Sequence, residues 1–114
     1  MINVIVVPET EKFIGPVSHE GLVWINLDLG VPNLKGQNAK YLAPYWISGK
    51  IKGANRIYQI VSVDDDGEST IIKLGNSFLL NEPWNNIGQH RRFEYHPLSS
   101  FGMKELKDGL LETI

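Results

Sequence analysis

The chain has 114 residues, a length that suits one domain built around a single hydrophobic core. Its 11 basic and 13 acidic residues give a formal net charge of −2, so the overall composition does not by itself indicate a nucleic-acid-binding protein, although a local basic face is compatible with it. The absence of cysteine excludes disulfides, thiol catalysis and cysteine-ligated metal sites, and favours the cytoplasm over secretion.

The first predicted elements are two β-strands. Residues 2–7 are rich in β-branched side chains, which suit a pleated and packed surface, and Pro8 ends this run. No basic residue precedes it and no apolar run approaches the roughly 20 residues of a membrane span, so we expect neither a signal peptide nor a membrane partner. Residues 22–29 follow as a strand with partial apolar–polar alternation, and residues 30–40 have the composition of a long loop.

The middle of the chain predicts a β-hairpin over residues 56–74. Two runs of β-branched residues flank Asp64-Asp65-Asp66-Gly67, which is a strong turn signal. An aromatic-rich segment, 41–47, precedes the hairpin. Shorter strands are predicted after it at 77–80 and 91–95, with a turn at Gly75-Asn76.

The C-terminal segment has a helical pattern. A serine at position 99 or 100 can cap a helix, and three apolar residues then recur at helical spacing: Met103, Leu106 and Leu110. We therefore predict an amphipathic helix over residues 100–113. Together with the strands, this predicts a mostly β (α+β) single domain over 1–114, a small curled or closed β-barrel with a C-terminal helix, an open α+β sheet being the alternative.

Motifs for catalysis or metal binding are absent from the sequence, so we expect no cofactor, no metal ion and no enzymatic activity. The cluster at residues 64–66 lacks the spacing of a calcium loop, because Glu68 follows too early, and is better interpreted as a solvated hairpin tip. His90 and His96 would lie about 20 Å apart on an unbroken strand, too far to share an ion. Phosphate loops and the serine-hydrolase elbow are missing.

Aromatic and basic residues are the more informative classes. Aromatic faces can stack on nucleobases, for about 1–3 kcal/mol each, although most aromatic residues of a small domain belong to its core. We expect Trp84 to be partly exposed, because it follows Pro83 in a polar segment. Five basic residues could line a site for a phosphate backbone or simply serve solubility: Lys50, Lys52, Arg56, Arg91 and Arg92.

Two segments carry a family resemblance. Residues 45–50, Tyr-Trp-Ile-Ser-Gly-Lys, and 56–63, Arg-Ile-Tyr-Gln-Ile-Val-Ser-Val, resemble the central part of PUA-like domains, the group that includes the EVE, ASCH and YTH families. The resemblance covers residues 41–95. It implies a pseudo-barrel with a cleft for RNA or for a flipped, often modified, base. The glycine–X–lysine–X–X–glutamate–X–arginine pattern of ASCH domains is not present, so no ribonuclease activity is implied.

The same resemblance implies roles for particular residues. The implied base pocket consists of Tyr45, Trp46, Tyr58 and Trp84, and the implied cationic rim is the set of five basic residues given above. Our first hypothesis is therefore a nucleic-acid or modified-base binding module with RNA or DNA as its partner. The first alternative is a protein-interaction module, such as a phage or mobile-element inhibitor of a host defence complex. The other is a small enzyme with a non-local site around Asp28, Glu94 and His96.

Overall fold

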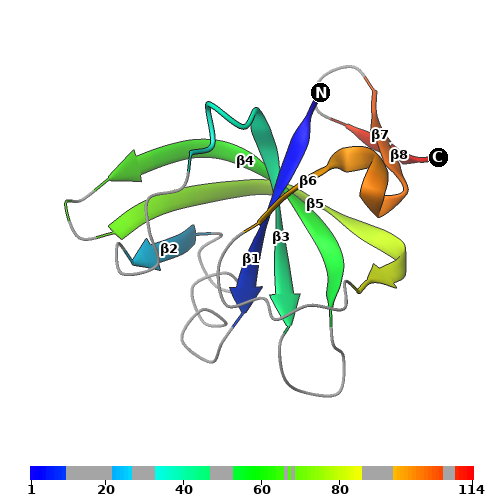
Figure 1. The fold of residues 1–114 in the computed structure, drawn as a ribbon, viewed down its shortest axis with the longest axis horizontal. Helices are drawn as coiled ribbons and strands as arrows, with labels where there is room; N and C mark the ends of the chain where they lie inside the picture. Colours follow the sequence, from blue (N-terminus) through cyan, green and yellow to red (C-terminus); the bar gives the residue numbers. More distant parts are fainter. Residues whose placement is uncertain are drawn as a thin grey trace.

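The computed structural model describes residues 1–9, 22–26, 33–46, 53–65, 67, 69–85, 94–106 and 110–114. These residues form a six-stranded sheet of order β2-β5-β4-β3-β1-β6 and a two-stranded sheet, β7-β8 (Figure 1). All pairs of neighbouring strands are antiparallel except β1 and β3, which are parallel. The elements are β1 (Asn3–Glu9), β2 (Leu22–Asn26), β3 (Ala39–Trp46), β4 (Ala54–Asp65), β5 (Ser69–Trp84), β6 (Glu94–Pro97), the 3-10 helix η2 (Leu98–Phe101), β7 (Met103–Glu105) and β8 (Leu111–Thr113).

Both faces of the central strands are covered. Successive side chains of a strand point to opposite faces, so Val4 and Val6 of β1 enter one core cluster while Ile5 and Val7 enter another. All four are at most 2% exposed. The apolar run from Val4 to Val7 is explained by this two-sided burial. The predicted first strand is confirmed, but it does not end at Pro8: it continues to Glu9, with Pro8 paired to Tyr45.

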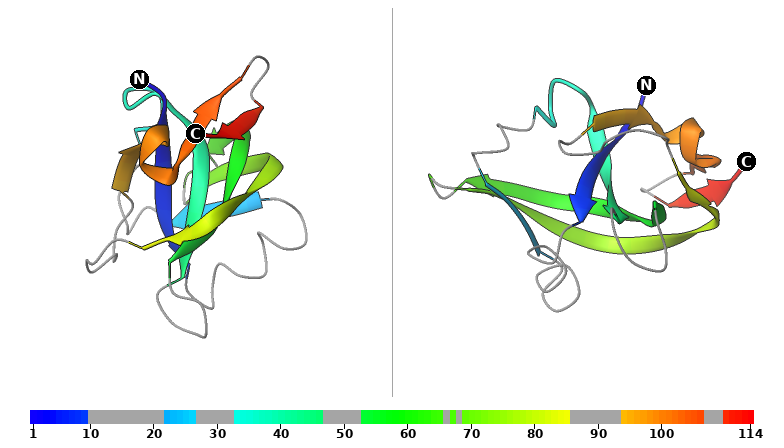
Figure 2. Two further views of the ribbon diagram at one scale, coloured as in Figure 1. Left: turned by 90° about the vertical axis from the view of Figure 1, so that its right-hand side faces the viewer. Right: turned by 60° about the horizontal axis from the view of Figure 1, so that its bottom comes forward.

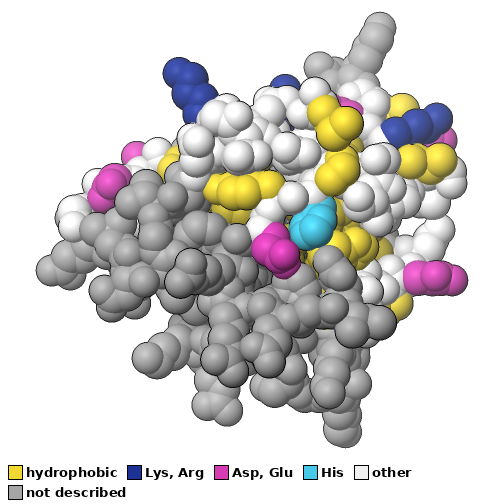
Figure 3. All heavy atoms as spheres, viewed as in Figure 1, with side chains coloured by type: hydrophobic (Ala, Val, Ile, Leu, Met, Phe, Trp, Pro, Cys, Tyr) yellow, Lys and Arg dark blue, Asp and Glu magenta, His cyan; other side chains and the backbone are white. Residues whose placement is uncertain are grey.

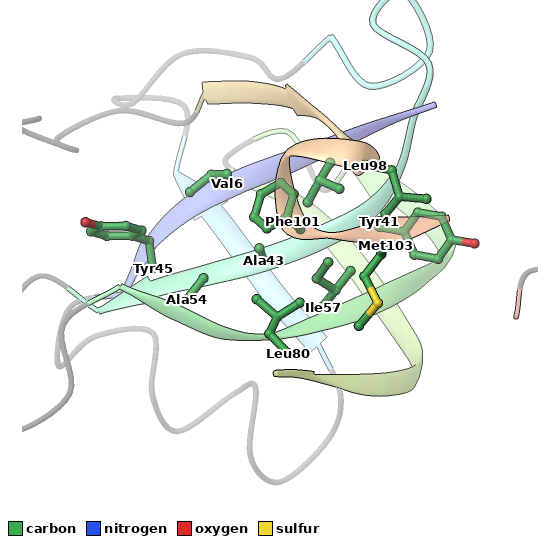
Figure 4. Packing of buried hydrophobic residues seen from close by; sticks show 11 residues of the cluster. Val6, Tyr41, Ala43, Tyr45, Ala54, Ile57, Leu80, Leu98, Phe101 and Met103 are labelled. Atoms are coloured by element: carbon green, nitrogen blue, oxygen red, sulfur yellow. The ribbon is translucent and has the colours of Figure 1, made fainter. Parts of the chain in front are cut away.

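The first core cluster lies between the sheet and the C-terminal segment. It consists of Val4, Val6, Tyr41, Ala43, Tyr45, Ala54, Ile57, Leu80, Leu98, Phe101 and Met103. Figure 4 shows Tyr45 at one end of this cluster and Tyr41 with Met103 at the other, each tyrosine hydroxyl pointing away from the other labelled side chains. The last three members come from η2 and β7, so these elements close the cluster as a lid over β1, β3 and β4.

The second core cluster lies on the opposite face and is closed by a turn. It consists of Ile5, Val7, Leu34, Leu42, Ile72 and Leu74, with Tyr58 and Tyr95 packed against it. The backbone N–H of Asn33 donates to the Tyr95 hydroxyl over 2.8 Å, and the Asn33 carboxamide oxygen accepts from the Gly36 N–H over 3.1 Å. These bonds fix the turn that precedes β3, which is the described part of the loop predicted at 30–40.

The predicted hairpin is confirmed and is longer than expected. β4 and β5 pair from Ala54–Trp84 to Asp65–Thr70, and the turn expected at Gly75-Asn76 is instead part of β5. At the tip, Asp65 accepts a hydrogen bond from the Gly67 N–H over 2.7 Å, and Gly67 has a positive φ. The hairpin extends beyond β1 and β3 as an arm, with β2 beside β5 (Figures 1 and 2).

The predicted C-terminal helix is wrong. The described part of residues 98–114 contains η2 and the two short strands β7 and β8, and no α-helix. Gly102 has a φ of 71°, in the left-handed region, and ends η2. Leu98, Phe101 and Met103 all enter the first core cluster, a spacing that a single helical face would not provide, while Leu106 and Leu110 are 45% and 49% exposed. Tertiary packing has therefore overridden the helical periodicity.

The predicted closed barrel, and with it the PUA-like barrel with a C-terminal helix, is also corrected. Within the described ranges, the six-stranded sheet ends at β2 on one side and at β6 on the other, and these two strands do not pair with each other. Of the expected architecture, the β-rich character agrees with the structure, as do the first strand and the central hairpin. The described residues include no helix with the length and hydropathy needed to cross a bilayer.

Candidate ligand site

Tyr45 and Trp84, two of the four predicted pocket residues, lie against each other. Trp84 is the last residue of β5 and is paired with Ala54, while Tyr45 lies near the end of β3. Their rings meet edge to face, with centroids 5.8 Å apart and an interplanar angle of 84°. Tyr45 is only 6% exposed and belongs to the core, whereas Trp84 is half-buried, as its polar surroundings predict.

Two further rings pack on Trp84. Phe101 of η2 is stacked on the indole with a centroid distance of 4.8 Å and an angle of 29°, and His96 of β6 is tilted at 4.9 Å. Such contacts hold an aromatic side chain in one orientation. Because these rings already cover much of the indole, a ligand would meet its remaining exposed part and not an open stacking face.

A hollow of about 450 Å³ opens beside this aromatic cluster. Its volume falls within the range of about 300–1,000 Å³ that is typical of small-molecule sites. Apolar residues in its lining include Trp84, Phe101 and Met103. The polar side chains in its lining are those of Asn81, Glu82, Asn85, Ser100 and Thr113. An apolar lining combined with amide, hydroxyl and carboxylate groups suits a planar ring that carries hydrogen-bonding groups on its edge.

The rim of the hollow is anchored to the core by a hydrogen bond. The Tyr45 hydroxyl donates to the carboxamide oxygen of Asn85 over 2.9 Å. The oxygen already accepts this hydrogen bond, and the Asn85 amide nitrogen carries two hydrogens that can be donated to a ligand. Asn85 is exposed, so its amide is accessible from solvent.

A histidine and a glutamate flank the aromatic cluster. His96 Nε2 lies 3.9 Å from Glu94 Oε2, with 24% and 44% of the respective side chains exposed. The two residues stand two apart on β6 and therefore on the same face of the strand. Figure 3 shows histidine beside an acidic side chain, with hydrophobic side chains around them. Although both side chains are partly exposed, the two facing atoms, His96 Nε2 and Glu94 Oε2, are themselves buried.

The small-enzyme alternative gains little from this pair. Glu94 and His96 do lie together, but Asp28 lies outside the described residues. Within the described ranges, no group of three or more histidine, aspartate or glutamate residues is placed to hold a metal ion. Asp64 and Asp65 are exposed at the hairpin tip, where Asp65 caps the turn, in agreement with the structural interpretation of the acidic cluster.

Of the other predicted site residues, the two whose side chains the structure describes, Tyr58 and Arg56, do not line the hollow. Tyr58 packs against the second core cluster, on the opposite face of the sheet from Tyr45. Arg56 is exposed on β4, and its Nη1 donates to the Ser77 hydroxyl over 3.2 Å. Trp46 ends β3, but its side chain lies outside the described part, as do four of the predicted rim residues: Lys50, Lys52, Arg91 and Arg92. Whether these residues contact a ligand stays a prediction.

Sequence reasoning missed the residues that complete the hollow. Asn81 and Asn85 flank Trp84 in a polar segment, which was a usable signal. Phe101 and Thr113 come from the C-terminal segment, which was expected to be helical, so no local pattern placed them beside Trp84. No family model, no curated protein and no solved structure matches the chain. A functional conclusion must therefore come from the geometry and chemistry of the site itself.

Proposed function

We propose that the protein is a nucleic-acid-binding module that receives one unpaired or modified base of RNA or DNA in the hollow beside Trp84. The observation that supports this proposal is the combination of ring-bearing and polar residues in the lining of one hollow of about 450 Å³. Proteins that read single-stranded or extruded bases use the same two components, aromatic contact with the ring and hydrogen bonds to its edge.

The polar groups favour a base over a phosphate. Glu82 is the charged side chain among the residues that line the hollow, and a carboxylate repels phosphate. A carboxylate does accept from an exocyclic amino group such as that of cytosine, and an asparagine amide can both donate to and accept from a base edge. Asn81, Glu82 and Asn85 therefore offer both hydrogen-bond donors and acceptors. A base edge can pair with both kinds of group, whereas a phosphate only accepts.

In this proposal, the sugar–phosphate backbone runs outside the hollow. Its contacts are assigned to the basic residues predicted as the rim, of which Arg56 lies on β4 away from the hollow and the rest lie outside the described residues. Backbone contacts by lysine and arginine release counterions, so affinity should fall with increasing salt concentration. The cysteine-free sequence leads us to propose the cytoplasm as the compartment.

The experiment is a titration of fluorescently labelled single-stranded RNA and DNA, with and without a modified cytosine, monitored by anisotropy at low salt. We expect Asn85→Ala to reduce the affinity about 5-fold to 100-fold, which corresponds to about 1–3 kcal/mol for a specific base contact. Leu79→Ala is the matched control, because Leu79 is 61% exposed on the same strand β5 and does not line the hollow.

Two results would overturn the proposal. One is the absence of binding to every oligonucleotide at low salt. The other is unchanged affinity in both Asn85→Ala and Trp84→Phe, the second of which keeps an aromatic ring in the core-facing position. Trp84→Phe also reports directly on the site, because quenching of tryptophan fluorescence by oligonucleotide should be weaker in this variant than in the wild type.

A second candidate function, protein interaction, is favoured by a separate observation. Val61 and Val63 of β4 are 56% and 46% exposed on the arm of the sheet, where apolar β-branched residues gain nothing from facing water. Val61 and Val63 lie towards the end of β4, whereas Trp84 pairs with Ala54 at the start of the same strand. The two functions would therefore use different surfaces.

A further inference from the structure

Strands β3 and β4 separate in the middle of the sheet. Their described pairing is confined to Tyr41–Gln59 and Leu42–Tyr58. β4 continues to Asp65, paired with β5 on one side, while β3 begins at Ala39 and pairs with β1. From Ile60 onward, β4 therefore has one strand neighbour among the described residues, and its other edge faces the gap.

Among the described residues, this gap holds a hollow. A hollow of about 500 Å³ lies between Val63 of β4 and the segment from Asn33 to Lys40. A second hollow of about 200 Å³ is lined by Gln59, Ile60 and Glu105, among others. Ala39 and Lys40 line both hollows. We call the larger hollow, between Val63 and the segment from Asn33 to Lys40, the β3–β4 groove.

The β4 side of the groove has the properties of an edge strand that can accept another strand. The register with β5 shifts between Tyr58 and Ser62, but from Ser62 to Asp65 it runs without a further shift. These four residues therefore have regular strand geometry. An edge strand presents backbone N–H and C=O groups to a new strand, and natural proteins usually protect such an edge with lysine, proline or a covering segment. Val63 lies on this stretch and is 46% exposed.

The opposite side of the groove carries positive charge. Lys35 and Lys40 are both exposed and line the larger hollow. Acidic residues lie elsewhere around the groove, with Asp64 and Asp65 at the hairpin tip and Glu105 at the smaller hollow. A protein segment can place an acidic side chain beside Lys35 and Lys40 and neutral side chains beside Asp64 and Asp65, whereas a nucleic acid carries a charge at every phosphate and would meet the carboxylates as well.

The shape of the groove favours a single strand over a second copy of the chain. Neighbouring strands lie about 4.8 Å apart. A second copy that paired through its own β4 would bring its β5 as well, since β4 and β5 pair along their length. That β5 would be directed at the segment from Asn33 to Lys40, which forms the other wall of the groove. A lone extended segment avoids this collision.

We propose that the β3–β4 groove binds an extended segment of a partner protein, which adds as a strand to the edge of β4 at Ser62–Asp65. The segment contributes backbone hydrogen bonds to β4, apolar side chains towards Val63 and Leu34, and an acidic side chain towards Lys35 and Lys40. This site is distinct from the hollow beside Trp84 and does not depend on the function proposed for that hollow.

The experiment measures binding between the full chain and a short synthetic peptide that alternates valine with glutamate and threonine. Binding is measured by calorimetry and, with a fluorescently labelled peptide, by anisotropy. Two control peptides test the mode of binding. One carries N-methyl groups on alternate residues, which removes the donors that pair with β4, and the other has lysine in place of glutamate. We expect each control peptide to bind at least tenfold more weakly than the parent.

Variants of the chain locate the site. Val63→Asp places a charge on the edge and should weaken peptide binding at least tenfold. Leu79→Asp is the matched control, since it introduces the same charge at an exposed apolar residue of β5 that lines neither hollow. Far-UV circular dichroism and the denaturation midpoint establish that both variants are folded. Lys35→Glu together with Lys40→Glu should invert the preference between the glutamate and lysine peptides.

Two results with the peptide would overturn the proposal: no detectable binding of the parent peptide, or binding that N-methylation leaves unchanged. Loss of oligonucleotide binding in Val63→Asp would overturn it by assigning the groove to nucleic acid. A wild-type dimer that Val63→Asp dissociates would overturn it by assigning the groove to a second copy. Asn85→Ala separates the two proposals, because it should weaken oligonucleotide binding and leave peptide binding unchanged.

Discussion

The hydroxyl of Tyr45, a core residue of β3, donates a hydrogen bond of 2.9 Å to the side chain of Asn85, the exposed residue that follows β5. The bond joins two segments that are 40 residues apart in the sequence. Through it the interior of the sheet sets the orientation of a polar group at the rim of the hollow beside Trp84. The stability of the fold and the chemistry of the candidate site are therefore linked at one contact.

We expect Tyr45→Phe to separate these two effects. The substitution keeps the buried ring and removes only the hydroxyl, and Asn85 can hydrogen-bond to water instead. The free energy of unfolding should therefore decrease by about 0.5–1.5 kcal/mol, the usual net contribution of one hydrogen bond. Urea denaturation measures this value. Oligonucleotide affinity should fall as well, because the Asn85 amide loses its fixed orientation.

The control for this prediction is Tyr58→Phe. Tyr58 is half-buried against the second core cluster, on the opposite face of the sheet from the hollow. Its hydroxyl should be dispensable for oligonucleotide binding if the base lies beside Trp84. Equal affinity in the two variants would contradict the role given to the Tyr45–Asn85 hydrogen bond.

Gly53 allows a second prediction about the same region. It has a φ of +102°, and a Cβ added to it would lie 2.5 Å from the backbone oxygen of Trp84. Gly53→Ala thus combines a strained backbone conformation with an overlap against main chain, which cannot move without displacing β5. We expect a loss of at least about 2 kcal/mol in the free energy of unfolding. Thermal and urea denaturation both measure it.

Gly67 at the hairpin tip is the matched control. It has a φ of +89°, but a Cβ there would meet no atom within 4 Å. Gly67→Ala therefore incurs only the conformational penalty, about 1–2 kcal/mol. The difference between the two variants isolates the contact with Trp84. A Gly53→Ala variant as stable as Gly67→Ala would show that the end of β5 can relax freely.

The strands could be predicted where local pattern and tertiary environment agree. Residues 4–7 are all apolar and form the part of β1 that is buried on both faces, and the turn signal at 64–67 falls at the tip of the β4–β5 hairpin. The C-terminal segment is the counter-example. Its helical periodicity placed Leu106 and Leu110 in the core, but Gly102 redirects the chain and leaves them exposed. Local periodicity does not contain the tertiary contacts with residues distant in the sequence that decide which apolar side chains are buried.

The candidate site could be predicted only in part. Trp84 was expected to be half-exposed because of its polar neighbours, and it is. Its contacts with His96 and Phe101 could not be derived, because they depend on how β6 and η2 fold back over the sheet. The separation of Tyr58 from Tyr45 could not be derived either. It follows from the register of two strands whose pairing the sequence does not specify.

The last prediction concerns alkaline pH and rests on Tyr41, which is 1% exposed. Burial, and secondarily the negative charge of Glu105, raise the pKa of Tyr41 above the ordinary 10.0. The unfolded chain therefore loses this proton at a lower pH than the folded protein does. The stabilising contribution is fully present below about pH 10 and is lost as the pH rises through the raised pKa of the folded state.

Tyr41→Phe removes this ionisation while keeping the ring, so the decrease in unfolding free energy between about pH 9 and pH 11 should be shallower than in the wild type. Burial also raises the pKa of Tyr95, although its hydrogen bond with Asn33 opposes the shift, so a smaller decrease should remain in the variant. Glu105→Gln should reduce the steepness slightly, and Glu112→Gln on β8 is the control for removing an acidic charge. Urea denaturation at a series of alkaline pH values measures these slopes. A Tyr41→Phe variant that loses stability as steeply as the wild type would show that Tyr41 does not keep its proton in the folded core.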